Sequence, residues 1–454
     1  MSHLSLNPAR PSDVVLEFDG PTAAVAPAAA RAAQAARAWA ATPAAARGAA
    51  LSVVADALEQ RAGELAALVT REVGKPIVEA RGEIARAVAI YRYYATAVLA
   101  PDGETYPGAS PSAILAARRY PVGVCAVIAP WNFPVATPSW KIAPALAYGN
   151  AVLFKPAVEA TATARLLSEI VAAQLPDGLL ELLEGGADVG AALVAEERVD
   201  AVTFTGSLAG GRAVAQQAAA RGIPAQCEMS GHNPSIVLPS ADLAAAAQKI
   251  AYAAMGYAGQ KCTATSRIIV HDDVYDELRD RLVAAVEALT VVDPSDERCL
   301  VGPLIDAAAR SSASAAVEAS GGSVLTGGGA LDDDGFYLAP ALVELPQQSG
   351  PLGRDEVFAP VAGLLRARSA EHAIELANDS PFGLVASVFT RELGSALEAL
   401  PALRYGLVRV NAPTSGLDYH VPFGGSKASG LGPKEQGLAA RDFYTETRTL
   451  LVEA

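Results

Sequence analysis

One cysteine lies in a stretch whose residues suit covalent chemistry. Cys262 follows Gly259, which favours a turn, and it precedes the β-rich run 267–270. A thiol on such a bend can leave its own backbone N–H free to point at the group that the sulfur attacks. Because only the thiolate is a good nucleophile, a site built on Cys262 must lower the pKa of the thiol or supply a nearby base. The alternative is an inert, buried cysteine.

Two other residues supply what such a nucleophile needs. Glu228 opens the stretch 228–234 and is a candidate base, although an ion pair at a strand end explains it equally well. Asn132 lies in a proline-flanked loop beyond the apolar run 122–129, which predicts an inner parallel strand. Open α/β sheets bind ligands beyond the carboxyl ends of their strands. A role as an oxyanion donor therefore explains Asn132 better than a loop cap does.

The composition excludes several classes of partner. The chain has 454 residues, of which 51% are hydrophobic and 19% are charged, so it can bury a large core. Its net charge is −14 without a block of basic residues, which argues against nucleic acid and anionic membranes as partners. The N-terminus lacks the features of a signal peptide, and no apolar run is long enough to span a bilayer. We therefore expect a cytoplasmic protein.

The four cysteines show no paired spacing. This pattern fits a reducing compartment and predicts neither a disulfide framework nor a zinc site, so no bound metal is expected. Cys125, Cys227 and Cys299 are interpreted as packing residues, and Cys227 as a small buried hydrophobe directly before Glu228.

Helical periodicity dominates the first hundred residues. Three or four helices are expected within 28–100, and Glu79 and Glu83 are interpreted as part of a solvated helix face. The stretch 101–111 is rich in proline and glycine and is expected to be a loop. An exposed strand is predicted at 113–120.

Alternating strands and helices follow. From 122 to 221 these units predict a parallel sheet of the dinucleotide-binding type, and a second α/β block is expected from 267 to about 420. The Gly/Pro-rich stretch 412–432 predicts a long loop, and loops of this length are usually functional. The terminal stretch 445–452 predicts an edge strand that could pair with a partner subunit.

Glycine-rich turns offer two candidate phosphate sites. Gly206 and Gly211 would let the backbone approach a phosphate, and Ser207 between them can donate a hydroxyl at a helix start. Taken alone, this stretch fits a plain strand-to-helix turn better. Together with the other motifs of the chain, it favours phosphate binding. The run 327–329 is interpreted as a hairpin loop, because the aspartates at 332–334 would repel phosphate.

Seven short motifs follow one another along the chain. They are Pro130-Trp131-Asn132-Phe133-Pro134, Lys155-Pro156-Ala157, Phe204-Thr205-Gly206-Ser207, the stretch Glu228 to Pro234, Gly259-Gln260-Lys261-Cys262, Glu356-Val357-Phe358 and Pro422-Phe423-Gly424-Gly425-Ser426-Lys427. In this order they resemble the aldehyde dehydrogenase superfamily over nearly the whole chain. The resemblance implies a Rossmann-type NAD(P)-binding domain at 1–102 and 122–230, a second α/β catalytic domain at 231–424, and a small β oligomerisation flap from 103–121 and 436–454.

The resemblance also implies a role for each motif residue. Cys262 would be the nucleophile that forms a thiohemiacetal and then a thioester, Glu228 the general base, and Asn132 the oxyanion donor. Lys141 would support this catalytic set. The cofactor, NADP or NAD, would be held by Lys155 at the adenosine ribose, Ser207 with Gly206 and Gly211 at the pyrophosphate, Glu356 at the nicotinamide ribose, Phe358 at the nicotinamide ring, and Trp131 as a supporting residue.

Three departures from the family pattern bear on the cofactor and the base. Val158 stands where the family commonly has a glutamate that binds the ribose hydroxyls, so we predict that NADP⁺ is accepted or preferred. His232 replaces the usual lysine and Ser230 replaces a glycine, which removes a positive group from near Glu228 at pH 7. The pair Pro433-Lys434 replaces Arg-Glu, and no catalytic consequence is expected from it.

The stretch 411–422 resembles the α-ketoglutaric semialdehyde dehydrogenase branch of the family. This resemblance implies an aldehyde that carries a distal carboxylate, bound by an arginine or by a serine and backbone nest that the sequence does not identify. Ser415 and His420 are interpreted as loop structure rather than substrate contacts.

Three alternative functions remain open. One is a broad-range enzyme for aliphatic or aromatic aldehydes, and another is a catalytically silent binding relative. A relative that transfers the acyl group to coenzyme A fits less well, because Glu228 provides for hydrolysis. A homodimer or homotetramer is expected.

Overall fold

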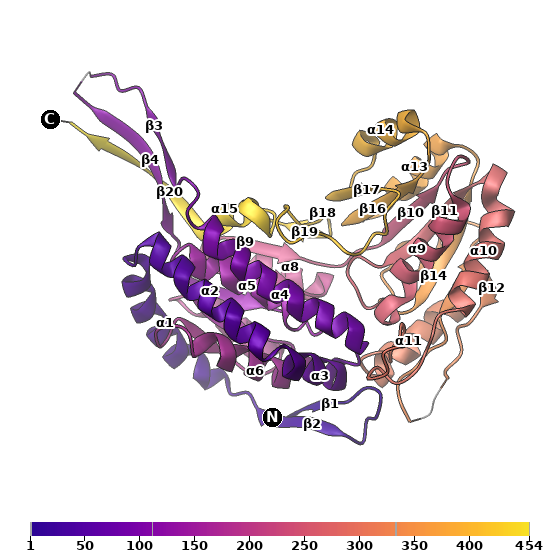
Figure 1. Cartoon of the computed structure of the whole chain (residues 1–454), viewed down its shortest axis with the longest axis horizontal. Coiled ribbons are helices and arrows are strands. Elements are labelled where there is room, and N and C mark those ends of the chain that lie inside the picture. The colour runs from indigo at the N-terminus through magenta and orange to yellow at the C-terminus, as the bar shows by residue number, and fades with distance from the viewer. Residues whose placement is uncertain (1, 111, 332–333, 454) are drawn as a thin grey trace.

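The computed structural model describes residues 2–110, 112–331 and 334–453, and it consists of two α/β bodies and a projecting β-sheet (Figure 1). The expected mixed α/β class with parallel sheets is confirmed. Asp332 and Asp333 of the predicted acidic loop lie outside the described residues. Around them, Gly327 and Gly328 have φ values of 72° and 90°, and Ala330 pairs with Leu338 in an antiparallel bridge, as in a hairpin.

The first body is built on a six-stranded sheet in the order β19-β9-β8-β5-β6-β7. Strands β5 to β9 run parallel, and the short β19 is antiparallel to β9. β5 and β6 are buried at every residue, as expected of apolar inner strands covered on both faces. The strands are β5 (Val124–Ile128), β6 (Ala151–Lys155), β7 (Leu180–Leu182), β8 (Ala201–Thr205), β9 (Ala225–Glu228) and β19 (Gly430–Leu431).

Eight helices belong to this body in the described chain. The small buried side chains of α1 let it lie close on β5 and β6, and α4 packs against α2, α3 and α5. The helices are α1 (Val25–Ala40), α2 (Ala44–Gln60), α3 (Ala62–Val73), α4 (Ile77–Ala97), α5 (Ala136–Ala147), α6 (Thr161–Ala172), α7 (Ala187–Ala195) and α8 (Leu208–Arg221).

The second body is built on a seven-stranded sheet in the order β12-β13-β14-β11-β10-β16-β17. The pairs are parallel except for the antiparallel β12 and β13. Its strands are β10 (Asn233–Val237), β11 (Thr265–His271), β12 (Ser323–Thr326), β13 (Ala341–Glu344), β14 (Val361–Ala367), β16 (Val385–Phe389) and β17 (Leu407–Val410). Its helices are α9 (Leu243–Met255), α10 (Tyr275–Glu287), α11 (Ala307–Glu318), α12 (Gly350–Arg354), α13 (Ala370–Asn378) and α14 (Leu393–Ala402).

The two sheets present opposite ends of their strands to each other. In the first sheet the strand order reverses between β5 and β8, and the loops that leave their carboxyl ends carry Asn132 and Ser207. Ligands bind at such a reversal in open α/β sheets. In the second sheet, the residues that face this edge come just before or at strand starts: Cys262 precedes β11, Glu356 precedes β14 and Leu384 precedes β16.

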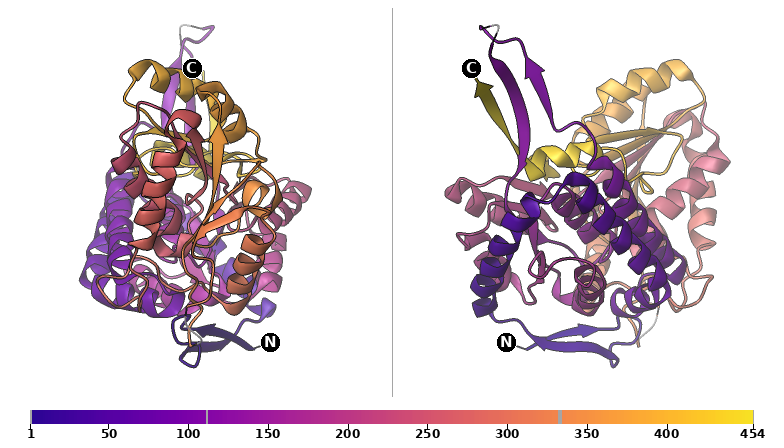
Figure 2. Two further views of the ribbon diagram at one scale, coloured as in Figure 1. Left: turned by 90° about the vertical axis from the view of Figure 1, so that its right-hand side faces the viewer. Right: turned by 60° about the vertical axis from the view of Figure 1, so that its left-hand side comes forward.

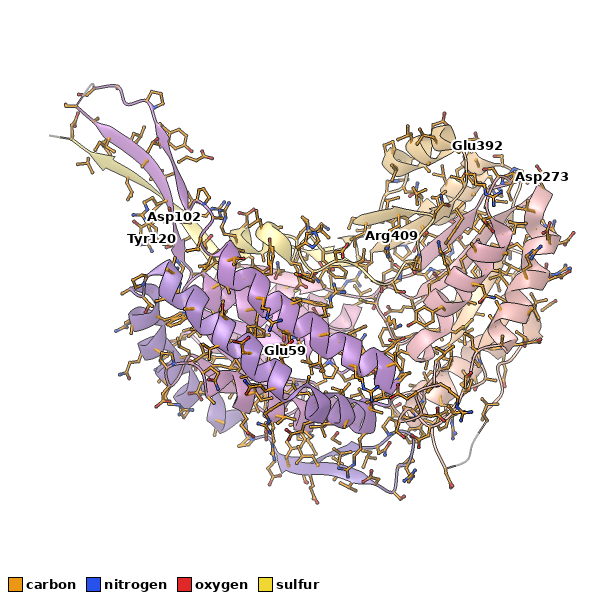
Figure 3. All side chains as sticks on the ribbon, viewed as in Figure 1. Glu59, Asp102, Tyr120, Asp273, Glu392 and Arg409 are labelled. Carbon is orange, nitrogen blue, oxygen red and sulfur yellow. The ribbon has the colours of Figure 1, made fainter. Side chains whose placement is uncertain are left out.

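A three-stranded antiparallel sheet projects from the first body (Figures 1 and 2). It pairs β20 (Thr445–Val452) with β4 (Ile114–Pro121), and β4 with β3 (Gly103–Tyr106). Asp102 and Tyr120 mark the base where the sheet leaves the body (Figure 3). β20 forms an edge, as the pattern at 445–452 predicted. We refer to this sheet as the flap.

The expected loop at 101–111 is partly wrong, because β3 lies within it. Glycine and proline there indicated a break, but Gly103 has a packing reason. A Cβ at Gly103 would lie 2.2 Å from the backbone oxygen of Ala117, its neighbour on β4. The glycine therefore allows the strands to approach, and the long-range partner β4 makes the strand.

The remaining elements are short. β1 (Ser2–Leu6) and β2 (Val14–Asp19) form a hairpin near the N-terminus, and β15 (Phe382–Gly383) pairs with β18 (Ser426–Lys427). α15 (Ala440–Tyr444) leads into β20. Within the described residues, no helix has the length and apolar composition that crossing a bilayer would require.

Candidate active site

A cavity of about 640 Å³ lies where the two bodies meet. Its wall combines loops after β5 and β8, the face of α4, the segment before β11 and the loop before α15. Cys262, Asn132 and Glu228, predicted as nucleophile, oxyanion donor and base, all line it. Of the predicted cofactor residues, the cavity wall includes Trp131, Gly206, Ser207, Glu356 and Phe358.

A left-handed turn carries the chain into the cysteine. Tyr257 and Ala258 have φ values of 56° and 52°, and Gly259 follows with φ 65°. Left-handed backbone costs about 1–2 kcal/mol for each non-glycine residue, so surrounding contacts must hold the turn. A Cβ at Gly259 would lie 2.1 Å from the backbone oxygen of Ala359, so the predicted turn glycine has no room for a side chain.

Two asparagines hold the backbone around Cys262. Asn233 Nδ2 donates to the carbonyl oxygens of Cys262 and Ala264, each at 2.8 Å. Asn132 Nδ2 donates to the carbonyl oxygen of Gln260 at 2.9 Å. An amide NH₂ has two hydrogens, so this bond orients Asn132 and leaves one hydrogen for a ligand. The predicted oxyanion donor is thereby positioned beside the cysteine turn.

Glu228 is held from both its backbone and its side chain. Its carbonyl accepts from Gly206 N at 3.1 Å, which joins the end of β9 to the turn after β8. Its Oε2 accepts from Gly425 N at 2.9 Å. Burial, and then the negative charge of Glu435, raise the pKa of Glu228 to about 8, while the charges of Lys434 and Lys141 oppose the rise. Such a carboxyl group suits general base catalysis near neutral pH.

The thiol of Cys262 is protonated in this environment. Burial raises its pKa to about 12, and the carboxylates of Glu356 and Glu228 add to the rise. The turn therefore does not supply a standing thiolate. A base has to remove the proton, and Glu228 is close enough for its charge to act on the thiol.

Lys141 lies behind the cavity rather than in its wall. Its ammonium group forms a buried ion pair with Glu435 and donates to Thr203 Oγ1 at 2.8 Å. Trp140 Nε1 donates to the other carboxylate oxygen of Glu435 at 2.8 Å. The charge of Lys141 lowers the pKa of Glu228.

Several of the predicted cofactor residues belong to the first body and lie near the carboxyl ends of its strands. Their contacts differ. Ser207 caps α8, with its Oγ accepting from Gly210 N at 3.2 Å. Lys155 ends β6, is buried, and donates to the carbonyl oxygen of Pro156 at 2.7 Å. Gly211 donates its N–H to Ser207 O at 2.9 Å, and a Cβ there would lie 2.5 Å from Met229. Gly211 therefore serves helix packing within this structure.

The opposite wall of the same region comes from the second body. Glu356 Oε1 accepts from Gly231 N at 2.8 Å, and burial raises the pKa of Glu356 to about 7. The rings of Trp131 and Phe358 meet edge to face, with centroids 5.7 Å apart. Thr205 Oγ1 is buried, lines the cavity and has no hydrogen-bond partner among the described residues.

The interpretation of Glu79 and Glu83 as a solvated face is wrong. Glu83 is 3% exposed, pairs with the fully buried Lys75, and accepts from the backbone N–H groups of Val135 and Ala136 at 2.8 and 2.9 Å. It thereby fixes the start of α5 behind Asn132. Glu79 accepts from Lys261 Nζ and from Tyr252 OH, each at 2.8 Å. Helical charge spacing in sequence fits a surface helix, but Glu83 is buried by packing within the first body and Glu79 by packing against the second.

Three of the residues that depart from the family pattern, His232, Ser230 and Lys434, have distinct surroundings. The ring of His232 faces Leu352 O, 3.2 Å away, and burial lowers its pKa well below the usual value, so it brings no charge to Glu228. Ser230 hydrogen bonds to Glu356. Lys434 donates to the carbonyl oxygens of Gly424 and Gly425 beside the Glu228 carboxylate. Because the charge of Lys434 lowers the pKa of Glu228, the structure favours an influence of the Pro433-Lys434 pair on the base over the predicted absence of a catalytic consequence.

The long stretch 412–432 contributes to the cavity through the segment 415–417 and through Phe423. Ser415, Gly416 and Leu417 line it, and His420 does not belong to the described lining. Arg409, which lies on the side of the second sheet nearer the first (Figure 3), donates from Nη1 to Ser415 O. Sequence reasoning did not identify Arg409 or Arg86, the cavity-lining arginine of α4. Arginines in helix and strand patterns gave no signal of their direction.

Comparison with known proteins gives concordant matches over the whole chain. The model of the aldehyde dehydrogenase family matches residues 3–450. The alpha-ketoglutaric semialdehyde dehydrogenase of Bacillus subtilis (strain 168) is 41% identical, over 98% of this chain and 94% of that protein. The alpha-ketoglutarate semialdehyde dehydrogenase of Haloferax volcanii is 39% identical, over 98% of this chain and 94% of that protein. The crystal structure of an NAD-dependent aldehyde dehydrogenase from Sinorhizobium meliloti superposes with a TM-score of 0.97 at 33% identity, covering 100% of this chain and 92% of that one.

Proposed function

The chain belongs to the aldehyde dehydrogenase family and is an oxidoreductase acting on aldehydes, and we propose that it oxidises a carboxylate-bearing semialdehyde such as α-ketoglutaric semialdehyde through a thioester on Cys262. The observation that carries the proposal is the common cavity of Cys262, Asn132 and Glu228. Asn132 and Cys262 come from loops of the two bodies, and Glu228 comes from the end of β9. Their convergence supports a shared chemical step better than three separate structural roles.

In the first step, the ionised Glu228 carboxylate takes the proton of the Cys262 thiol. The sulfur then bonds to the carbonyl carbon of the aldehyde, and the carbonyl π electrons move to its oxygen. The free hydrogen of Asn132 Nδ2 and the backbone N–H of Cys262 are the donors proposed for this oxyanion. Fixed donors aimed at developing charge lower the barrier without reorganising during the reaction.

In the second step, the oxyanion re-forms its double bond as the carbon loses hydride, which leaves a thioester. A bound nicotinamide cofactor supplies the acceptor for that hydride. Glu228 releases the thiol proton to solvent and, ionised again, takes a proton from water, whose oxygen attacks the thioester carbon. Collapse of the second adduct releases the carboxylic acid and the Cys262 thiolate, and proton return restores the resting thiol.

The residues at the carboxyl edge of the first sheet fit a dinucleotide. The unpartnered Thr205 Oγ1 and the start of α8 offer polar groups to a pyrophosphate, and Ser207 would contact the same group. Lys155 would hold the adenosine ribose, Glu356 the nicotinamide ribose, and Phe358 with Trp131 would flank the ring. Gly206 would give the backbone close access to the cofactor.

The choice between NAD⁺ and NADP⁺ depends on charge near Lys155. The absence of a carboxylate at Val158 supports acceptance of NADP⁺. Glu159 and Asp188 lie near enough to raise the pKa of Lys155 against the lowering effect of burial, so negative charge remains in the region. We propose that both cofactors are used.

The substrate proposal draws on the two semialdehyde dehydrogenases described above. A broad-range activity on aliphatic or aromatic aldehydes is the competing proposal, because aromatic side chains, among them Trp131, Phe133 and Phe423, line the cavity. The experiment is a panel of aldehydes crossed with both cofactors, read as kcat/KM from NAD(P)H absorbance. Preference for carboxylate-bearing aldehydes by at least about 10-fold over neutral ones of the same length supports the proposal. Equal use of both classes favours the broad-range activity.

We also propose assembly into a homodimer or homotetramer through the flap. Ile114, Leu451 and Val452 are 60–63% exposed on it, and an edge strand offers unpaired backbone groups. Light scattering of the full chain and of an I114K/L451K variant tests this. The variant should have a smaller mass, and an unchanged mass would contradict a role for the flap.

A further inference from the structure

Two cationic side chains line the cavity in the described part of the chain, Arg86 and Lys261. Lys261 has a fixed partner, because its Nζ lies 2.8 Å from Glu79 Oε1. Arg86 has no salt bridge to any described residue, and its Nε is buried without a hydrogen-bond partner. Arg86 as a whole is half-buried, but a buried guanidinium nitrogen without a partner is costly, and a ligand in the cavity can complete its contacts.

The neighbours of Arg86 on the same helix show how unusual this is. Arg81 pairs with Glu297, and Arg92 pairs with Asp56 and Glu59. Those two arginines are on exposed faces of α4. Arg86 instead lies on the face with Gly82 and Val78, four and eight residues earlier, which lines the cavity.

The acidic groups whose charges act on Arg86 do not form ion pairs with it. Burial lowers the pKa of Arg86, and the charges of Asp418, Glu83 and Cys262 oppose that lowering. Glu83 is committed to Lys75 and to two backbone N–H groups. Asp418 is on the exposed outer part of its loop and forms no salt bridge with Arg86. The influence of Cys262 shows that Arg86 lies within electrostatic range of the reacting sulfur.

We propose that Arg86 binds the distal carboxylate of the aldehyde substrate and thereby determines specificity. This inference deepens the proposed function and rests on it, because it assumes that the aldehyde carbon reaches Cys262. The planar guanidinium can bind both carboxylate oxygens in parallel. The segment 415–417 lines the same cavity from the second body, and Arg409 holds this segment by donating to Ser415 O.

The test compares wild type with Arg86→Gln and Arg86→Lys on α-ketoglutaric semialdehyde, succinic semialdehyde and butanal. R86Q should lower kcat/KM for both semialdehydes by about 10- to 100-fold, mainly through KM, and change that for butanal less than about threefold. R86K should fall between, because it keeps the charge and loses the fork. Arg92→Gln is the matched control on the same helix and should change neither substrate class. An equal loss on butanal and the semialdehydes would overturn the proposal, as would no loss on either.

Calorimetry with glutarate provides a readout that does not depend on turnover. Glutarate carries carboxylates and no aldehyde, and it should bind wild type and R92Q at least about 10-fold more tightly than R86Q. If wild type oxidises no aldehyde but binds glutarate through Arg86, the proposed function fails while the carboxylate site stands. If aldehydes are oxidised and glutarate binding is the same in R86Q, the carboxylate site alone is rejected.

Discussion

Gly424 lies directly against the carboxylate of Glu228. A Cβ at Gly424 would be 2.4 Å from Glu228 Oε1, and the glycine has a φ of 149°. The next residue, Gly425, donates its N–H to the other carboxylate oxygen at 2.9 Å. Gly424 and Gly425 of the 422–427 motif thus contact and hold the carboxylate of the proposed base. This contact gives a physical reason for two successive glycines in the motif.

Replacing Gly424 with alanine should therefore displace Glu228. We expect kcat/KM to fall by about 100-fold, because misplacing a catalytic group by about 1 Å can cost that much. Gly222→Ala is the matched control: Gly222 also has positive φ (70°), and a Cβ there meets nothing within 4 Å. Both variants should have a lower Tm because of backbone strain. Only G424A should also have a lower kcat/KM at a temperature where both variants are folded. Equal kcat/KM values in the two variants would contradict this.

The pH dependence of the reaction should report Glu228. The base acts when ionised, so kcat/KM should rise with pH through an apparent pKa near 8. Lys434 lowers the pKa of Glu228 through its charge, so Lys434→Met should move the midpoint to higher pH. Lys434→Arg should restore the midpoint, and the exposed Lys249→Met should leave it unchanged. A midpoint that K434M does not move would separate Lys434 from the base.

Glu228→Gln should stabilise the fold while it removes activity. The raised pKa means that between about pH 4.5 and 8 the folded state keeps a proton that the unfolded state releases, so stability declines with rising pH. Glutamine removes this loss and can still accept from Gly425 N. We expect the Tm gain of E228Q to be larger at pH 8 than at pH 4.5, with kcat lowered by about 10²–10⁴-fold. Differential scanning calorimetry checks the first statement, and the exposed Glu59→Gln is the control.

Asn132→Ala should lower kcat without a comparable change in the reactivity of the Cys262 thiol. Loss of one oxyanion donor costs about 3 kcal/mol of barrier, which is about 10²–10³-fold in kcat. The rate of Cys262 alkylation by iodoacetamide involves no oxyanion and should change far less. A parallel loss of alkylation and turnover would mean that Asn132 acts by holding the Gln260 carbonyl and the cysteine turn.

Cofactor selection should respond to charge at position 158. Val158→Glu restores the carboxylate that the family commonly has and should lower kcat/KM for NADP⁺ at least about 10-fold through repulsion of the 2′-phosphate. The value for NAD⁺ should stay within about threefold. Val53→Glu, on an exposed part of α2, is the charge-matched control. A wild type that cannot reduce NADP⁺ would defeat the prediction before any variant is made.

Several features followed from local pattern alone. The apolar run before Asn132 predicted a buried parallel strand, and Gly259 predicted a turn before Cys262. The order of the seven motifs indicated the family and so the mixed α/β fold. Strand burial and turn chemistry depend on neighbouring residues, and motif order is read directly along the chain. These signals therefore need no knowledge of contacts in space.

Other features depended on which surfaces meet. Glu83 on α4 became a buried partner of Lys75, Gly103 became part of a strand because β4 lies beside it, and Gly424 became a contact of Glu228 almost 200 residues away. Arg86 has the same helical context as Arg81 and Arg92, and only the packing of the second body against the first makes its face of α4 a wall of the cavity that contains Cys262. The sequence by itself determined the elements and the reactive groups. Tertiary structure decided their directions and their electrostatic environment, because burial and Coulomb interactions depend on distance in space and not on separation along the chain.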